Sequence, residues 1–355
     1  TSLAIGVLQA LFLIRPAKVA FKDFMDPSVM FIFASIVIGL VFTKTGLTRR
    51  LAYNMLAIVG ERTSMIYLGC FVVTSALTHI MAHTAVAATM FPILMAIYTL
   101  YGADDQPTRF GKGLFIGMAF TAGAGSMITL LGAARGAVAL GFYNDIVQVE
   151  VTFFELSYYM FPIGWLLVFL SWGLIMFMFR PERSAIPGLR EKARRLYSET
   201  GALTRDELFV ALVVLGVVVT LSLKSFIPAM ASVDKTAVVL LSTVVFFLFR
   251  ILSLKDLEQI PWNIVLLFGG GFALAQGFRV TGLSQLIGSR FAGLEGAPPY
   301  AIIVLICGGL TFLTELTSNT ATASVMLPVL GALSEALQLP PMILMVTATL
   351  CASFA

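Results

Sequence analysis

Long apolar stretches separated by short polar or charged clusters run along almost the whole chain. Clear examples are residues 152–179, 208–223 and 237–249. The apolar runs reach the length of about 20 residues that an α-helix needs to cross a bilayer. The composition agrees, because the chain is 59% hydrophobic and 12% charged, with a mean hydropathy of +0.95. The pattern therefore predicts an all-α, multi-pass membrane protein that is embedded in the lipid bilayer.

The chain contains an internal repeat: one apolar unit occurs twice, with a shift of 236 residues and no gap. The matching positions are Thr45-Gly46-Leu47 with Thr281-Gly282-Leu283, Thr78 with Thr314, Thr84 and Ala85 with Thr320 and Ala321, and Met90 and Pro92 with Met326 and Pro328. A duplicated apolar unit with polar residues at its centre is typical of secondary transporters. We expect Thr84 and Thr320 to face each other across one binding site.

Each copy contains two short apolar arms that meet at a polar tip. The first tip is His83-Thr84, and the second reads Thr317-Ser318-Asn319-Thr320. Arms of about 17 residues, with no loop charges between them, are short for independent spans. We predict re-entrant helical hairpins at residues 63–100 and 299–337. Their tips would lie at bilayer depth, covered by protein or by a watery cavity.

The apolar run at residues 114–143 is interrupted by two glycine-rich clusters, 123–126 and 132–136. Glycine at this density predicts a broken helix, although close helix packing is the competing explanation for Gly117 and Gly123. Arg135 favours the break, because a cation in a membrane segment is costly without a function or a partner.

These features divide the chain into four parts. Residues 1–25 are interpreted as the remnant of an N-terminal scaffold helix, and 26–144 as the first repeat. Residues 145–260 hold connecting scaffold helices, and 261–355 form a second repeat that stops in the helix after its hairpin. With the shift of 236 residues, the segment that matches the glycine-rich break would begin just beyond the last residue. We therefore expect this chain to be a piece of a longer protein.

The net charge of +4 is concentrated in a basic loop at residues 180–206, where seven Lys and Arg residues stand against three glutamates. By the positive-inside rule this loop is cytoplasmic. A nucleic-acid partner is excluded, because these charges lie between membrane segments and lack a binding module. The three cysteines have irregular spacing and predict neither disulfides nor zinc.

Ser318-Asn319-Thr320 at a hairpin tip has a clear physical use. Two helix ends meet there, so amide N–H groups and a positive dipole end can receive an anion. The hydroxyls and the amide add donors for carboxylate or sulfate oxygens, and freed carbonyls can coordinate sodium. A plain solvent loop is the alternative, although Glu315 is the only charge nearby.

The run Ser318-Asn319-Thr320-Ala321-Thr322-Ala323, followed by Met326-Leu327-Pro328, resembles the signature of the divalent anion–sodium symporter family. Members of this family include sodium/dicarboxylate, sodium/citrate and sodium/sulfate cotransporters. The resemblance implies an inverted repeat with a scaffold and a mobile transport domain, a homodimer, and an elevator-like movement. It also implies that Asn319 and Thr320 contact the substrate, and that Thr314, Ser318 and Asn319 help to bind sodium.

The first half departs from this family pattern, and the chain is a divergent member in this respect. Ala82-His83-Thr84 replaces Ser-Asn-Thr, and Ala133-Ala134-Arg135-Gly136 replaces Thr-Pro-Pro-Asn. Thr84 can still bind the substrate, and Thr78 matches the sodium ligand Thr314. The missing hydroxyl and amide put the first sodium site in question.

His83 has three interpretations: a neutral donor to the anion, a titrating group that replaces sodium by a proton, or a structural residue. His79 and His83 also share a helix face and could hold a metal, but Ile80 stands where a metalloprotease has its glutamate. Arg135 either complements the anion's charge or pairs with an acidic neighbour. We expect His83, Thr84 and Arg135 to join Ser318, Asn319 and Thr320 in substrate binding.

The sequence predicts a secondary active transporter of small divalent anions, with C4-dicarboxylates coupled at least partly to sodium as the first choice. Such transport needs no covalent chemistry and no cofactor besides Na⁺, so we do not expect an enzyme. The alternatives are sulfate or tricarboxylate transport, proton coupling through His83, and anion exchange. An intramembrane metalloenzyme using His79 and His83, or an ion channel, is the more remote alternative.

Overall fold

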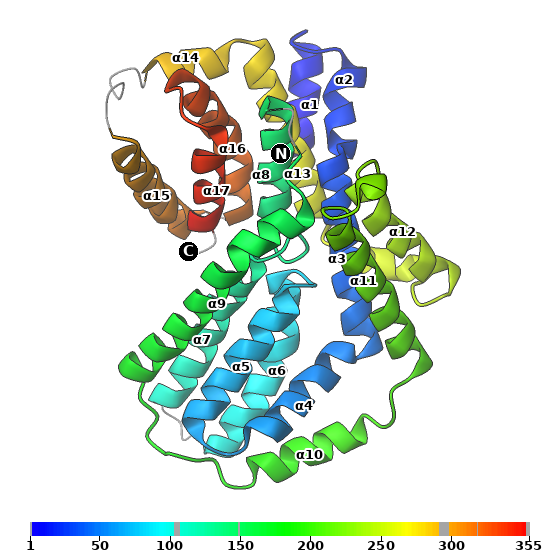
Figure 1. Ribbon diagram of the computed structural model, residues 1–355, viewed down its shortest axis with the longest axis vertical. Coiled ribbons are helices and arrows are strands. Elements are labelled where there is room, and N and C mark those ends of the chain that lie inside the picture. Colours follow the sequence, from blue (N-terminus) through cyan, green and yellow to red (C-terminus); the bar gives the residue numbers. More distant parts are fainter. Residues whose placement is uncertain (1, 103–106, 148–149, 291–297, 318, 353–355) are drawn as a thin grey trace.

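The computed structural model describes residues 2–102, 107–147, 150–290, 298–317 and 319–352 (Figure 1). Its α-helices are α1 (Ser2–Leu11), α2 (Ala17–Lys22), α3 (Pro27–Thr45), α4 (Leu47–Val59), α5 (Thr63–Thr78), α6 (His83–Tyr101), α7 (Arg109–Ser126), α8 (Ala134–Val147), α9 (Phe153–Met178), α10 (Leu189–Glu199), α11 (Arg205–Leu223), α12 (Lys235–Leu248), α13 (Trp262–Val280), α14 (Leu283–Arg290), α15 (Pro299–Leu316), α16 (Asn319–Ala336) and α17 (Pro341–Cys351). Three short 3₁₀ helices are η1 (Asp23–Met25), η2 (Pro228–Met230) and η3 (Leu254–Gln259).

The described helices confirm the all-α, multi-pass prediction. Six of them are long and apolar enough to cross a membrane: Ala17–Thr45, His83–Tyr101, Phe153–Met178, Arg205–Leu223, Trp262–Val280 and Pro299–Leu316. The only β contact among the described residues is an isolated bridge between Arg62 and Ala185. Many side chains on these helices are apolar and exposed, as expected where lipid replaces water as the neighbour.

Two helix pairs occupy opposite halves of the molecule (Figure 1). The pair α5 and α6 lies in the lower half of the view with α7 and α9, and α15 and α16 lie in the upper half beside α17. The turn from α5 to α6 and the start of α16 both point to the centre. The second arm of the first hairpin, α6, has 19 residues, and the first arm of the second hairpin, α15, has 18, slightly more than the sequence suggested. A re-entrant path for these pairs therefore stays a prediction.

The glycine-rich region separates α7 from α8 and packs tightly on the end of α5. A Cβ added at Gly125 would lie 2.3 Å from the Thr78 hydroxyl oxygen. At Gly132 it would lie 2.1 Å from the Thr78 carbonyl oxygen and 2.7 Å from that of Ser126. Close backbone approach, which only glycine allows, holds the break against the first hairpin.

The predicted basic loop contains a helix, α10, that packs against α4. Leu189 and Ala193 are buried in this contact, while the charged residues of α10 are exposed. An amphipathic helix of this kind is stabilised by its packed face rather than by its composition. The sequence showed the charges, but the apolar face was too short to stand out.

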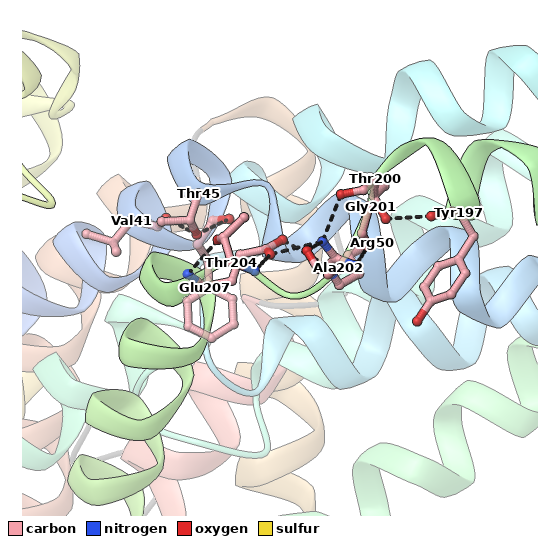
Figure 2. A network of polar contacts seen from close by, with 10 residues as sticks. Val41, Thr45, Arg50, Tyr197, Thr200, Gly201, Ala202, Thr204 and Glu207 are labelled. Carbon is pink, nitrogen blue, oxygen red and sulfur yellow. Dashed lines mark hydrogen bonds and ion pairs between the residues drawn. The ribbon is translucent and has the colours of Figure 1, made fainter.

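Arg50 fastens α4 to the segment between α10 and α11 (Figure 2). Its guanidinium donates to both carboxylate oxygens of Glu207, at 2.9 and 3.0 Å. It also donates to the carbonyl oxygens of Thr200, Gly201 and Ala202 at 3.0, 2.9 and 3.1 Å. The hydrogen-bonded carboxylate of Glu207 raises the pKa of Arg50 above its ordinary value, and this effect outweighs burial, which lowers the pKa. Arg50 is therefore a permanently charged structural clamp.

Candidate functional site

A large cavity of about 880 Å³ lies where the two hairpin tips approach each other. It is lined by Ile36, Gly39, Leu40, Thr43, Arg49, Ala82, His83, Thr84, Ala85, Ala88, Thr89, Pro92, Gly132, Arg135, Gln259, Pro261, Asn263, Ile264, Leu267 and Asn319. These residues come from α3, α4, α6, α8, α13, α16 and the turns beside them. The cavity has the size and the mixed apolar and polar wall of a small-molecule site.

Three helices begin at the wall of this cavity. His83 and Thr84 open α6, Arg135 is the second residue of α8, and Asn319 is the first residue of α16. The first turn of a helix leaves N–H groups without helical partners and carries a partial positive charge. At α6 the N-cap residue Ala82 supplies no side-chain cap. The local backbone is therefore arranged to attract an anion.

The charged residues of the wall have a single sign. Arg49 and Arg135 line the cavity, and no Asp or Glu occurs among the described lining residues. Arg135 is only 2% exposed, and its guanidinium lies 3.5 Å from the Ser126 hydroxyl oxygen, near the limit of a hydrogen bond. A buried guanidinium keeps its charge, so the cavity has a fixed positive side.

The structure brings four of the six predicted substrate residues together: His83, Thr84, Arg135 and Asn319 all line the cavity. Ser318 lies outside the described residues. Thr320 belongs to α16, but its side chain is not among those described. We predicted that Thr84 and Thr320 face each other across one site. The support for this prediction is that Thr84 and Asn319, the neighbour of Thr320, line the same cavity.

The predicted sodium ligands are arranged differently from each other. Asn319 lines the cavity, whereas Thr78 and Thr314 are buried and do not line it. The Thr78 hydroxyl donates to the Ser75 carbonyl at 2.6 Å, and that of Thr314 donates to the carbonyls of Leu310 and Thr311 at 3.0 and 2.9 Å. Both hydroxyls stabilise their own helices and keep lone pairs that could accept a cation.

Two further threonines lie at the second tip and were not among the predicted ligands. The hydroxyl oxygens of Thr317 and Thr322 are 2.5 Å apart, and Thr322 is buried. The second tip therefore offers several oxygen atoms close together, which is what a hard cation requires. At the first tip Met81 and Val86 match these two threonines, and Ala82 and His83 match Ser318 and Asn319, so it offers fewer oxygens.

The two histidines do not share a site. His83 lines the cavity, while His79 packs edge-on against Trp165 with ring centroids 5.8 Å apart. Among the described residues, no group of three His, Cys, Asp or Glu side chains could hold a metal. The helical i, i+4 relation is lost because α5 ends at Thr78 and a turn separates the two residues.

Sequence reasoning missed several polar residues of the cavity wall. Thr43, Arg49, Gln259 and Asn263 line the cavity from α3, α4, η3 and α13. These residues lie outside the repeated motifs. A search for polar residues at the ends of the helices that precede each hairpin would have singled them out.

The long apolar helices together with an electropositive central cavity define a multi-pass membrane protein of the transporter class. Comparison with known proteins agrees. A family model described as the sodium:sulfate symporter transmembrane region matches residues 2–355. The chain therefore belongs to this family, which confirms the resemblance seen at the second tip.

Named relatives are transporters, not enzymes. The sodium-dependent dicarboxylate transporter SdcS of Staphylococcus saprophyticus is 29% identical over 349 residues, which are 92% of this chain and 67% of the relative. The protein of the same name in Staphylococcus aureus strain USA300 is 27% identical over 374 residues, 99% of this chain and 72% of the relative. The chain is thus a sodium-coupled anion transporter and an integral, multi-pass protein of the cell membrane.

Proposed function

We propose that the chain transports C4-dicarboxylates such as succinate or malate together with sodium. The carrying observation is the convergence of three helix N-termini and Arg135 on a cavity without a described acidic residue. The two relatives are named as dicarboxylate transporters, which supports a dicarboxylate as the substrate over sulfate or a tricarboxylate.

Binding in this cavity removes water from the anion and replaces it with fixed donors. Arg135 supplies a full charge, and the N–H groups at the starts of α6 and α16 supply oriented dipoles. The Thr84 hydroxyl and the Asn319 amide add hydrogen bonds to carboxylate oxygens. A dicarboxylate compensated in this way carries little net charge across the membrane barrier.

We place a coupling sodium ion at the second tip, with Thr314 and Asn319 as ligands and with the hydroxyls of Thr317 and Thr322 beside them. Sodium held there would fix the start of α16, and with it the donors that the substrate needs. In this arrangement sodium and substrate would bind together, because each ligand stabilises the geometry that the other binds. The homodimer and the elevator-like movement remain part of this proposal.

The test is uptake of labelled succinate into proteoliposomes. We expect uptake that requires an inward sodium gradient and that excess unlabelled malate suppresses. Citrate and sulfate serve as competing anions. Strong competition by sulfate with none by malate would replace the dicarboxylate by sulfate as the substrate. Sodium flux without added substrate would favour a channel instead.

Proton coupling through His83 is a second candidate, and one observation favours it. His83 stands at the cavity wall where the matching residue of the second repeat is Asn319. Its Nδ1 atom is buried and has no hydrogen-bond partner in the described part of the chain. A ring in this state is available to bind the substrate or a proton. We propose substrate binding as its main role.

A further inference from the structure

Arg49 and Arg50 are adjacent in sequence and have opposite surroundings. Arg50 is buried and bonded to Glu207 and three carbonyl oxygens. Arg49 is exposed, lines the large cavity, and forms no hydrogen bond or ion pair with any described residue. One residue of this pair therefore holds the fold, and the other presents its charge to the cavity.

The position of Arg49 in its helix is electrostatically unfavourable. It lies in the first turn of α4, whose N-cap is Gly46 and which has no acidic residue in that turn. Cations are disfavoured near a helix N-terminus, because the backbone already carries partial positive charge there. Glu207 compensates Arg50, but no described carboxylate compensates Arg49. The fold keeps an uncompensated charge at this point.

Arg49 belongs to the part of the cavity wall that lies outside the hairpin tips. It shares that wall with Thr43, Gln259 and Asn263, which are exposed to the cavity. Arg135, His83 and Asn319 line the same cavity from the other elements. The cavity thus has two guanidinium groups, a deeply buried one at the tips and a solvent-accessible one on α4, the helix that packs against the basic α10.

We propose that Arg49 is an anion-capture residue: it draws the dicarboxylate into the cavity from the side on which α10 lies and releases it to Arg135 and the helix N-termini. This inference rests on the proposed function, because it takes the dicarboxylate as the anion. An exposed charge that lines a cavity with low-dielectric walls raises the association rate of an opposite charge. It contributes little to the bound complex, where water and salt still reach it.

The alternative is that Arg49 only orients the chain in the membrane, as expected from the positive-inside rule. Arg190 provides a matched control. It is exposed on α10, carries the same charge in the neighbouring basic segment, and does not line the cavity. A role in orientation, or in the general surface potential, predicts the same result for both residues.

The experiment measures succinate association by stopped flow on the full chain in nanodiscs, which leave both faces accessible. Sodium is fixed, and ionic strength is varied from about 0.05 M to about 0.5 M with choline chloride. The proteins are the wild type, Arg49→Gln, Arg49→Lys and Arg190→Gln. Arg49→Met, which keeps the aliphatic stem, replaces the glutamine variant should that variant fail to fold.

We expect Arg49→Gln to lower the association rate constant about three- to tenfold at low ionic strength and to approach the wild type at high ionic strength. The dissociation rate constant should stay within about twofold, because the bound site is unchanged. Arg49→Lys should retain most of the rate, and Arg190→Gln should behave as the wild type.

Three outcomes overturn the inference. One is equal association rates for the wild type and Arg49→Gln at low ionic strength. Another is a loss that appears mainly in dissociation at every ionic strength, which makes Arg49 a direct ligand. The third is an equal effect of Arg190→Gln. If the wild type does not bind succinate at all, the proposed substrate is rejected, and this result differs from the three outcomes that reject the role of Arg49.

Discussion

Arg135 carries a permanent charge with 2% of its surface exposed, at the wall of a cavity of about 880 Å³. Desolvating a cation is costly, and a protein retains such a group where a partner or a ligand meets its charge. Thr84 and Asn319 line the same cavity and supply neutral donors. At the residue scale, the sign of this charge supports the proposal that the ligand of this cavity is an anion.

Replacing Arg135 by Gln is expected to weaken succinate binding by about 2–4 kcal/mol, or roughly 30- to 1,000-fold, because a desolvated charge–charge contact is lost. The melting temperature of the substrate-free protein should change little, since Gln keeps a polar side chain and removes the cost of burying a charge. Titration calorimetry and thermal unfolding measure the two effects. Arg135→Lys keeps the charge as a control, and unaltered affinity in the Gln variant would remove Arg135 from the site.

His83→Asn gives the first tip the residue found at the second. We expect succinate affinity within a few fold of the wild type, because the amide can also donate a hydrogen bond, whereas His83→Ala should lose about 1 kcal/mol. The dependence of transport on pH between about 5.5 and 8 should be the same in the wild type and the Asn variant. A pH dependence that disappears in His83→Asn would establish proton coupling instead.

At the scale of elements, the break between α7 and α8 is fitted to the end of α5. Gly132→Ala would bring a Cβ within 2.1 Å of the Thr78 carbonyl oxygen, a backbone atom that has no room to move. We expect a loss of about 1–3 kcal/mol and a clearly lower melting temperature. Gly136→Ala is the control, because its Cβ would meet only Leu130 at 3.8 Å. Equal stability of the two variants would mean that the break does not depend on this contact.

The clamp between α4 and α11 joins two elements that are far apart in sequence. Arg50→Gln or Glu207→Gln should each lower the melting temperature by several degrees, because the partner stays buried without its opposite charge. The double variant should be less destabilised than the sum of the single ones. Thermal unfolding of all four proteins gives the coupling energy. Strict additivity would show that the pair, despite its bidentate geometry, contributes no coupling.

At the scale of the whole molecule, the cavity joins helices from both repeats, so a ligand bound there ties the two halves together. Succinate should raise the melting temperature only when sodium is present, because sodium fixes the start of α16 that the substrate contacts. A thermal-shift series with sodium or choline as the cation tests this, with Arg135→Gln as the non-binding control. A succinate effect of the same size in choline would contradict coupling at this site.

Much of this architecture was predictable from local patterns. The apolar runs predicted an all-α membrane protein, and the tip residues His83, Thr84 and Asn319, together with Arg135, were identified before the structure placed them at one cavity. The motif at Asn319 also led to the family. The division into scaffold and transport parts, the re-entrant path of the hairpins and the homodimer stay predictions.

The sequence by itself determined the long apolar helices, the repeat and the polar tips, because each depends on the composition of one short segment. Only the tertiary structure decided that Arg50 is bound to Glu207 while Arg49 faces the cavity, and that Gln259 and Asn263 complete its wall. The physical reason is that these surroundings are made by residues distant in sequence. A local pattern carries the chemistry of a side chain but not the identity of the neighbours that folding brings to it.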